Sequence, residues 1–137
     1  MKVMKLIIAG SRTIELEPQF LFSILDRLTN TSPFFDNFDD LEVVSGGAGG
    51  MDRSGEKFVE WYVGTQAYMS LKKFPADWNT HGKAAGPIRN RQMAEYADAL
   101  VLIWDGESKG SANMKMEMLS LNKPVFEIIM RSHNETK

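Results

Sequence analysis

The fold class of this chain is decided by the stretch Leu41-Glu42-Val43-Val44-Ser45-Gly46-Gly47-Ala48-Gly49-Gly50-Met51-Asp52. A short apolar run enters a turn that holds four glycines within five positions, and the turn opens onto residues with helical spacing. Glycine permits positive φ and lets a ligand approach the main chain, because no Cβ is in the way. The free N–H groups of the following helix favour an anion. This stretch therefore predicts a site for a phosphate-bearing ligand.

A second stretch repeats the pattern. The apolar run from Ala99 to Ile103 leads into Trp104-Asp105-Gly106-Glu107-Ser108-Lys109-Gly110-Ser111, and helical spacing follows again. One such turn is a weak signal, because a plain strand-to-helix connection also uses glycine. Two of them in 137 residues point to one phosphate-bearing ligand.

The other apolar runs alternate with amphipathic stretches, which is typical of βαβ units and a parallel sheet. We predict strands at 4–9, 41–45, 69–74, 99–104 and 125–129, helices after Pro18 and at 51–63, 87–97 and 111–121, and loops at 30–40 and 75–86. The fold class is therefore predicted as α/β, a Rossmann-like three-layer sandwich with a five-stranded parallel sheet. Residues 1–130 form its single domain, and residues 131–137 are predicted to form a flexible tail.

Composition narrows the class of protein. A formal net charge of −2, with 43% hydrophobic and 25% charged residues, is that of an ordinary globular domain. The lack of cysteine excludes disulfides, a thiolate nucleophile and a cysteine-based zinc site, and the two histidines suggest no metal set. No apolar run is as long as a membrane span, and the first one is too short for a signal peptide. We expect a cytoplasmic protein without membrane contact.

The glycine turns are predicted to meet at one rim, because ligands of parallel sheets bind outside the carboxyl ends of the strands. There, backbone atoms of six residues are predicted to line one cleft: Gly10, Ser11, Gly46, Gly47, Gly106 and Gly110. The full set of candidate ligand-binding residues is Gly10, Ser11, Arg12, Ser45, Gly46, Gly47, Ala48, Gly50, Asp52, Arg89, Asn90, Trp104, Asp105, Gly106, Lys109, Gly110 and Ser111.

Some of these candidates have a structural interpretation beside the functional one. Asp52 suits a helix N-cap and a ribose-hydroxyl acceptor equally well. The guanidinium of Arg12 suits bidentate phosphate contact. Arg89 and Arg91 lie about 200° apart around a helix, so only one of them faces a given ligand. We favour Arg89, which is nearer the helix start, with Asn90 as a base or ribose contact.

Two tryptophans and a lysine complete the candidates. Trp78 and Trp104 are each better explained as partly buried aromatics, although together they would be able to stack a base. Lys109 before Gly110 is similar to a phosphate-loop lysine, but the full phosphate-loop pattern is absent.

The same motifs resemble the YspA-like branch of the SLOG superfamily, which is named for the DNA-processing protein Smf/DprA and for the Lonely Guy phosphoribohydrolases. The resemblance covers about residues 5–125. It is carried by Gly10-Ser11-Arg12, Val44-Ser45-Gly46-Gly47-Ala48 with Gly50 and Asp52, Phe74-Pro75-Ala76-Asp77-Trp78, Gly82-Lys83-Ala84-Ala85-Gly86-Pro87-Ile88-Arg89-Asn90, and Trp104-Asp105-Gly106 with Ser108-Lys109-Gly110. It implies a Rossmann-like domain whose glycine turns bind a nucleotide or a nucleotide-derived ligand. The branch implies no settled reaction.

One departure bears on catalysis. The Lonely Guy enzymes carry Pro-Gly-Gly-x-Gly-Thr-x-x-Glu after the fourth strand, with the glutamate beside the bond that is cut. Alignment of their Gly-Thr on Gly110-Ser111 places Met114 where that glutamate belongs, and Glu117 follows nearly one helical turn later. The candidate catalytic carboxylates are Asp52, Asp105 and Glu107 at the rim, and Glu117 on the following helix, and none of them stands out.

Three functions compete. The first is a sensing or processing domain that binds a nucleotide or an ADP-ribose-like ligand and requires no cofactor. The second is a hydrolase that cleaves an N-glycosidic or phosphoester bond of such a ligand, so the sequence leaves enzymatic activity open. The third, a DNA-associated module, is disfavoured because the acidic balance makes nucleic acid an unlikely partner. The methionine-rich stretch 111–121 is a candidate face for pairing with a second copy.

Overall fold

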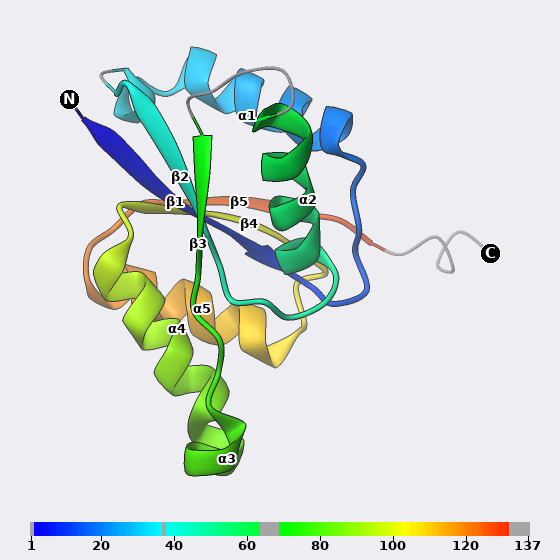
Figure 1. Cartoon of the computed structure of the whole chain (residues 1–137), viewed down its shortest axis with the longest axis vertical. Coiled ribbons are helices and arrows are strands. Elements are labelled where there is room, and N and C mark those ends of the chain that lie inside the picture. Colours follow the sequence, from blue (N-terminus) through cyan, green and yellow to red (C-terminus); the bar gives the residue numbers. More distant parts are fainter. Residues whose placement is uncertain (1, 37, 64–68, 132–137) are drawn as a thin grey trace.

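A computed structural model describes residues 2–36, 38–63 and 69–131 of the chain. Its five strands form one sheet in which every neighbouring pair is parallel, in the order β3-β2-β1-β4-β5 (Figure 1). The strands are β1 (Val3–Gly10), β2 (Asp40–Ser45), β3 (Met69–Lys73), β4 (Ala99–Trp104) and β5 (Val125–Ile129). The predicted five-stranded parallel sheet is confirmed.

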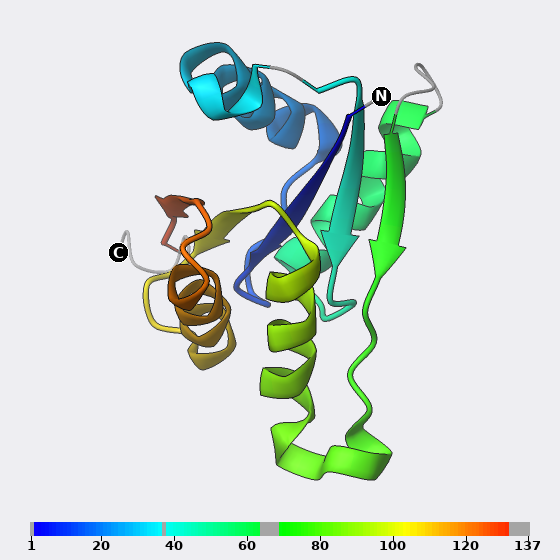
Figure 2. The ribbon, with the colours of Figure 1, turned by 90° about the vertical axis from the view of Figure 1, so that its left-hand side faces the viewer.

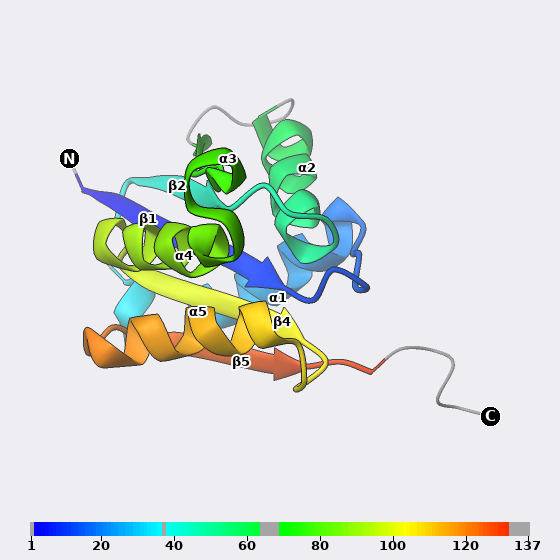
Figure 3. The same ribbon diagram turned by 90° about the horizontal axis from the view of Figure 1, so that it is seen from below.

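Helices cover both faces of this sheet, which gives three layers (Figures 1 and 3). Alternate side chains of a strand point to opposite faces. In β1, Leu6 and Ile8 therefore pack against α1 (Pro18–Thr31) and α2 (Met51–Val63), and Ile7 packs on the opposite face. That second core is shared with α4 (Ala85–Tyr96) and α5 (Lys109–Ser120). The predicted α/β class and Rossmann-like sandwich are confirmed.

The predicted loop at 75–86 is partly helical. It contains α3 (Trp78–His81) and the 3-10 turn η2 (Gly82–Ala84), which project beyond the carboxyl edge of the sheet (Figure 2). The side chain of Asp77 caps α3, because its Oδ1 accepts the N–H of Thr80 at 3.1 Å. This capping outweighs the glycines and proline that favoured a loop in the sequence.

The predicted loop at 30–40 also differs from the structure. Helix α1 continues to Thr31, and a short 3-10 turn, η1 (Pro33–Phe35), follows it. Phe35 is buried there, with its ring centroid 5.0 Å from that of Phe126 on β5. An aromatic side chain that reaches the core from a loop leaves no periodic signal in the sequence, so the prediction missed this element.

Several expectations concern the chain beyond these elements. Within the described residues, no helix is long and apolar enough to cross a membrane. The predicted tail lies outside the described residues from position 132 onward. On α5, Met114 and Met118 are buried and Met116 is 69% exposed, and pairing through this helix stays a prediction.

The carboxyl end of β1 leaves no room for a side chain at Gly10. This residue is in register with Ile103 on β4, and a Cβ at position 10 would overlap the Ile103 carbonyl oxygen. Backbone atoms of two central strands are unable to move apart without loss of hydrogen bonds. Gly10 is therefore a packing requirement of the sheet centre as well as a lining residue of the site described below.

We predict that Gly10→Ala lowers the free energy of unfolding by about 1–3 kcal/mol or more, as overpacking of a well-packed core does. Gly49→Ala is the matched control, because a Cβ at position 49 meets nothing within 4 Å. Urea unfolding of both variants measures the difference. Equal stability of the two variants would contradict the proposed overlap with Ile103.

Candidate functional site

A cavity of about 340 Å³ lies at the carboxyl ends of β1 and β4, between the middle of α4 and the first turn of α5. Connections from β1 and β4 leave toward opposite faces here, which is where ligands bind in open parallel sheets. The lining residues are Ala9, Gly10, Ser11, Arg12, Thr13, Gly46, Ala48, Asp52, Arg89, Asn90, Met93, Asp105, Ser108, Lys109, Gly110, Ser111 and Met114.

Most sequence candidates line this cavity, and five do not. Those outside the lining are Ser45, Gly47, Gly50, Trp104 and Gly106. The cleft predicted from six glycine and serine backbones therefore forms from four of them: Gly10, Ser11, Gly46 and Gly110. The candidate ligand-binding set lacked five lining residues: Ala9, Thr13, Met93, Ser108 and Met114. The spacing of Met93, four residues after Arg89 on one helix face, was the available signal for that residue.

Ser11 joins three loops at the cavity. Its buried Oγ accepts the N–H of Asp105 at 2.9 Å, and its carbonyl oxygen accepts the N–H of Met51 at 3.2 Å. Gly50 is required beside it, because its φ is +65° and a Cβ there would overlap the Ser11 carbonyl. The N-terminus of α2 is thus tied to the protein main chain at Met51. Gly50 shapes the site without lining it.

Ser45 shapes the first glycine turn from inside. Its buried hydroxyl donates to a carboxylate oxygen of Glu56 at 2.8 Å and accepts the N–H of Gly47 at 3.1 Å. Gly47 itself has a φ of +76° and is exposed. The polar atoms of Ser45 are therefore used by the turn, which explains why a residue predicted to bind ligand faces the protein.

Arg89 and Asn90 hold α4 against its neighbours. Arg89 donates through Nη1 to the carbonyl oxygen of Gly46 and through Nε to Oδ1 of Asn90, the latter at 3.0 Å. Asn90 donates through Nδ2 to Oδ1 of Asn113 at 2.8 Å and to the Gly110 carbonyl at 3.3 Å. The Asn90 amide is thus used within the protein, whereas Nη2 of Arg89 has no partner among the described residues.

The N-terminus of α5 has polar groups without partners. Ser108 occupies the N-cap position but makes no side-chain capping bond, and the N–H groups of Gly110 and Ser111 donate to no described residue. The Ser111 side chain is 5% exposed, and its Oγ is buried without a hydrogen-bond partner in the described part of the chain. Buried hydroxyls are rarely left unpaired, and this one belongs to a residue that lines the cavity, so it is able to pair with a group there.

Asp105 and Trp104 have structural roles at the second glycine turn. Oδ1 of Asp105 accepts the N–H groups of Glu107 at 2.8 Å and Ser108 at 2.9 Å, and these bonds lower the pKa of Asp105. The carboxylate thus stays charged and is poorly suited to act as an acid. Trp104 is buried and donates from Nε1 to Glu127 at 2.7 Å, so its ring is not available to a base.

Asp52 is the buried carboxyl of the cavity. It lies in the first turn of α2, and its Oδ2 accepts the N–H of Ala48 at 3.1 Å. Burial raises the pKa of Asp52 to about 6, against the opposing effects of the Ala48 N–H and the positive charges of Arg89 and Arg12. A pKa near the working pH suits a group that exchanges a proton during binding or catalysis.

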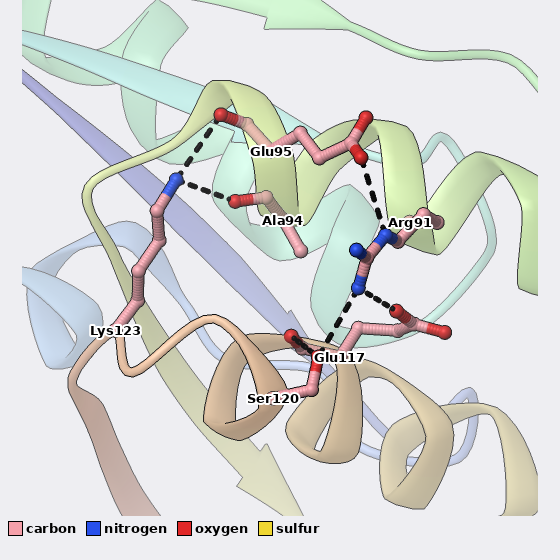
Figure 4. A network of polar contacts seen from close by, with 6 residues as sticks. All are labelled: Arg91, Ala94, Glu95, Glu117, Ser120 and Lys123. Carbon is pink, nitrogen blue, oxygen red and sulfur yellow. Dashed lines mark hydrogen bonds and ion pairs between the residues drawn. The ribbon is translucent and has the colours of Figure 1, made fainter.

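Glu117 lies outside the cavity and is paired with Arg91. Oε1 of Glu117 is 3.0 Å from Nη1 of Arg91, whose Nε also contacts Glu95 at 3.2 Å (Figure 4). Lys123, which follows α5, donates from Nζ to the carbonyl oxygens of Ala94 and Glu95 near the end of α4 (Figure 4). This network fastens α4 to α5 and the following turn. Glu117 is therefore placed as a structural residue, and Glu107 does not line the cavity either.

The position that the Lonely Guy pattern gives to a glutamate is apolar here. Met114 lines the cavity, is 2% exposed and belongs to the core beneath α5. Among the described residues, no group of three or more histidine, aspartate or glutamate side chains is placed to hold a metal ion. Asp52 is thus the lining carboxyl whose protonation is best suited to chemistry, with Asp105 held charged by its turn.

Comparison with known proteins gives one distant relative. The chain is 29% identical over 124 residues to "Gene 61 protein" of Mycobacterium phage D29, an alignment that covers 89% of this chain and 94% of that protein. No protein-family model matches the chain, and no solved structure matches it. The printed name of the phage protein states no activity.

We predict that Asp52→Asn stabilises the protein at pH 7–8. A raised pKa means that the folded state favours the protonated carboxyl, so stability is lost as the pH rises from about 4 to about 6. Because one pH unit corresponds to about 1.4 kcal/mol, the gain for Asn reaches about 1–3 kcal/mol above pH 6 and vanishes near pH 4. Denaturant titrations across this pH range measure it.

Asp105→Asn is the contrasting control. In the wild type, the lowered pKa of Asp105 means that its ionised form stabilises the folded state above the ordinary pKa of an aspartate. This contribution is lost as the pH falls. The variant should be less stable than the wild type at pH 7, with a difference that shrinks under acid conditions. A pH-independent effect of Asp52→Asn would show that burial does not perturb Asp52.

Proposed function

We propose that the cavity binds a phosphate-bearing small molecule of the nucleotide class, with its phosphate at the N-terminus of α5. The observation that carries this proposal is the buried, unpartnered Ser111 hydroxyl beside the unpartnered N–H groups of Gly110 and Ser111. One anion would accept hydrogen bonds from these donors, and the positive end of the helix dipole would attract it. The resemblance to YspA-like SLOG domains supports the same ligand class.

Positive charge around the cavity supports a phosphate ligand. Arg12 and Lys109 line it, are exposed, and make no ion pair with a described residue. Arg89 adds a third positive charge, although two of its nitrogens already bind the protein. Opposed to these three are the charged Asp105 and the buried Asp52, so the lining keeps a net positive charge even when both carboxyls are ionised.

The size of the cavity favours a compact ligand. Small-molecule sites range from about 300 to 1,000 Å³, and the cavity of about 340 Å³ lies at the lower end of this range. It suits the phosphate and sugar of a mononucleotide better than a whole dinucleotide. An ADP-ribose derivative would place part of its length outside the cavity.

We expect Arg12→Ala to weaken AMP binding by about 1.5–3 kcal/mol, the usual value of a hydrogen bond to a charged group. Gly110→Ala should also weaken binding without loss of stability, because Gly110 lines the cavity and a Cβ there meets no protein atom within 4 Å. Isothermal titration calorimetry with AMP measures both effects. Arg27→Ala is the control, since Arg27 is exposed on α1 and is not a lining residue. Unchanged affinity in Arg12→Ala would contradict the phosphate assignment.

A second candidate function is hydrolysis of the bound nucleotide, and Asp52 is the observation that favours it. Cleavage of the N-glycosidic bond would transfer the hydroxyl of water to ribose C1′ and a proton to the departing base. A carboxyl with a pKa of about 6 in the cavity is suited to supply that proton. The apolar Met114, in place of the Lonely Guy glutamate, argues for binding without turnover.

We therefore expect AMP to bind without release of adenine, as followed by chromatography over hours. Loss of a general acid or base costs about 10²–10⁴-fold in rate, so residual turnover should be near the limit of detection. Release that is abolished by Asp52→Asn but kept by Glu117→Gln would establish the hydrolase instead. Glu117→Gln is the matched control because that carboxylate pairs with Arg91 away from the cavity.

A further inference from the structure

Trp78 differs from the other two tryptophans in its surroundings. Trp61 lies against the rings of Phe22 and Phe58, and Trp104 is buried. Trp78 is 53% exposed and makes no ring contact with a described residue. It begins α3, in the projection beyond the carboxyl edge of the sheet, which is the edge that holds the cavity (Figure 2).

The position of Trp78 is fixed relative to α4. A Cβ at Gly86 would lie 3.6 Å from Cη2 of the indole, so the tip of the ring rests above that glycine. The Asp77 cap holds the first turn of α3, and Gly82, at a φ of +57°, turns the chain back toward α4. The main chain that carries Trp78 is therefore held by capping and a glycine turn.

Gly86 connects Trp78 to the cavity. It precedes Arg89 by three residues and Asn90 by four, and residues at these spacings share one face of a helix. Arg89 and Asn90 line the cavity. Trp78 thus lies over the same face of α4, about one helical turn of 5.4 Å farther from the sheet. Trp78 does not itself line the cavity, so a ligand held at α5 would meet the indole only with the part that extends out of the cavity along this face.

We propose that Trp78 recognises the base of the ligand by stacking a planar heteroaromatic ring on its indole. The inference rests on the proposed nucleotide site, and it adds that the ligand class is a nucleotide with an intact base rather than a sugar phosphate. An indole without a ring partner offers an open π-face, and stacking tolerates different bases because each has such a face. The Asn90 amide is already used between α4 and α5, so the lining side chains of α4 supply little hydrogen bonding for the base.

The experiment compares AMP with ribose 5-phosphate, which has the same sugar and phosphate but no base. Calorimetric affinities are measured for the wild type, Trp78→Ala and Trp78→Phe. We expect Trp78→Ala to weaken AMP binding by about 5- to 150-fold while ribose 5-phosphate binds as before. Trp78→Phe should restore most of the AMP affinity. Trp61→Phe is the matched control, because Trp61 lies on α2 and does not line the cavity.

The outcomes separate this inference from the proposed function. Equal AMP affinity in the wild type and Trp78→Ala overturns base stacking, and it leaves the phosphate site intact if ribose 5-phosphate binds. Equal weakening of both ligands in Trp78→Ala also overturns it, because the residue would then act on the shape of the site. Failure of the wild type to bind either ligand overturns the phosphate site and the base site together.

Discussion

The close approach of β1 and β4 at their carboxyl ends is the constraint on which the site depends. A side chain at Gly10 would overlap the main chain of β4, and Ser11 immediately afterwards bonds to both neighbouring loops. Because the two central strands meet here while their connections depart to opposite faces, a hollow opens beside α5. The residues that close-pack the sheet centre are thus also the residues that form the floor of the cavity.

Polar groups around this cavity are satisfied unequally. At the first glycine turn, Ser45 and Asp52 form hydrogen bonds within the protein, and Arg89 of α4 donates to the Gly46 carbonyl. These bonds hold the turn in place. At α5, Ser111 and its neighbouring N–H groups are left without partners in the described part of the chain. An unpaired buried donor costs about 1–3 kcal/mol, so a ligand that pairs it would stabilise the protein. This asymmetry favours α5 over α2 as the helix of the proposed phosphate site.

The two glycine turns are equivalent in the sequence, and the structure separates them. The central strands could be predicted because buried parallel strands are short apolar runs between turn residues. The edge strand β3 instead alternates Met69 and Leu71 with polar, exposed residues. The set of residues near the cavity was also mostly predictable, since carboxyl ends of parallel strands meet at one edge. The roles of the individual residues in that set could not be predicted, because Ser45 and Asn90 have the same hydrogen-bonding groups whether they face a ligand or the protein.

Local chemistry therefore determined which segments form strands and which turns precede helices, and it placed the glycine turns at one rim. Tertiary structure decided what each polar side chain binds. Asp52 was an N-cap candidate in the sequence, but it lies within the first turn of α2, where burial raises its pKa against the opposing charges of two arginines. Glu117 was a candidate catalytic group until its pairing with Arg91 placed it against α4. Such partners lie dozens of residues away along the chain, and only the packing of helices across the sheet brings them within hydrogen-bonding distance.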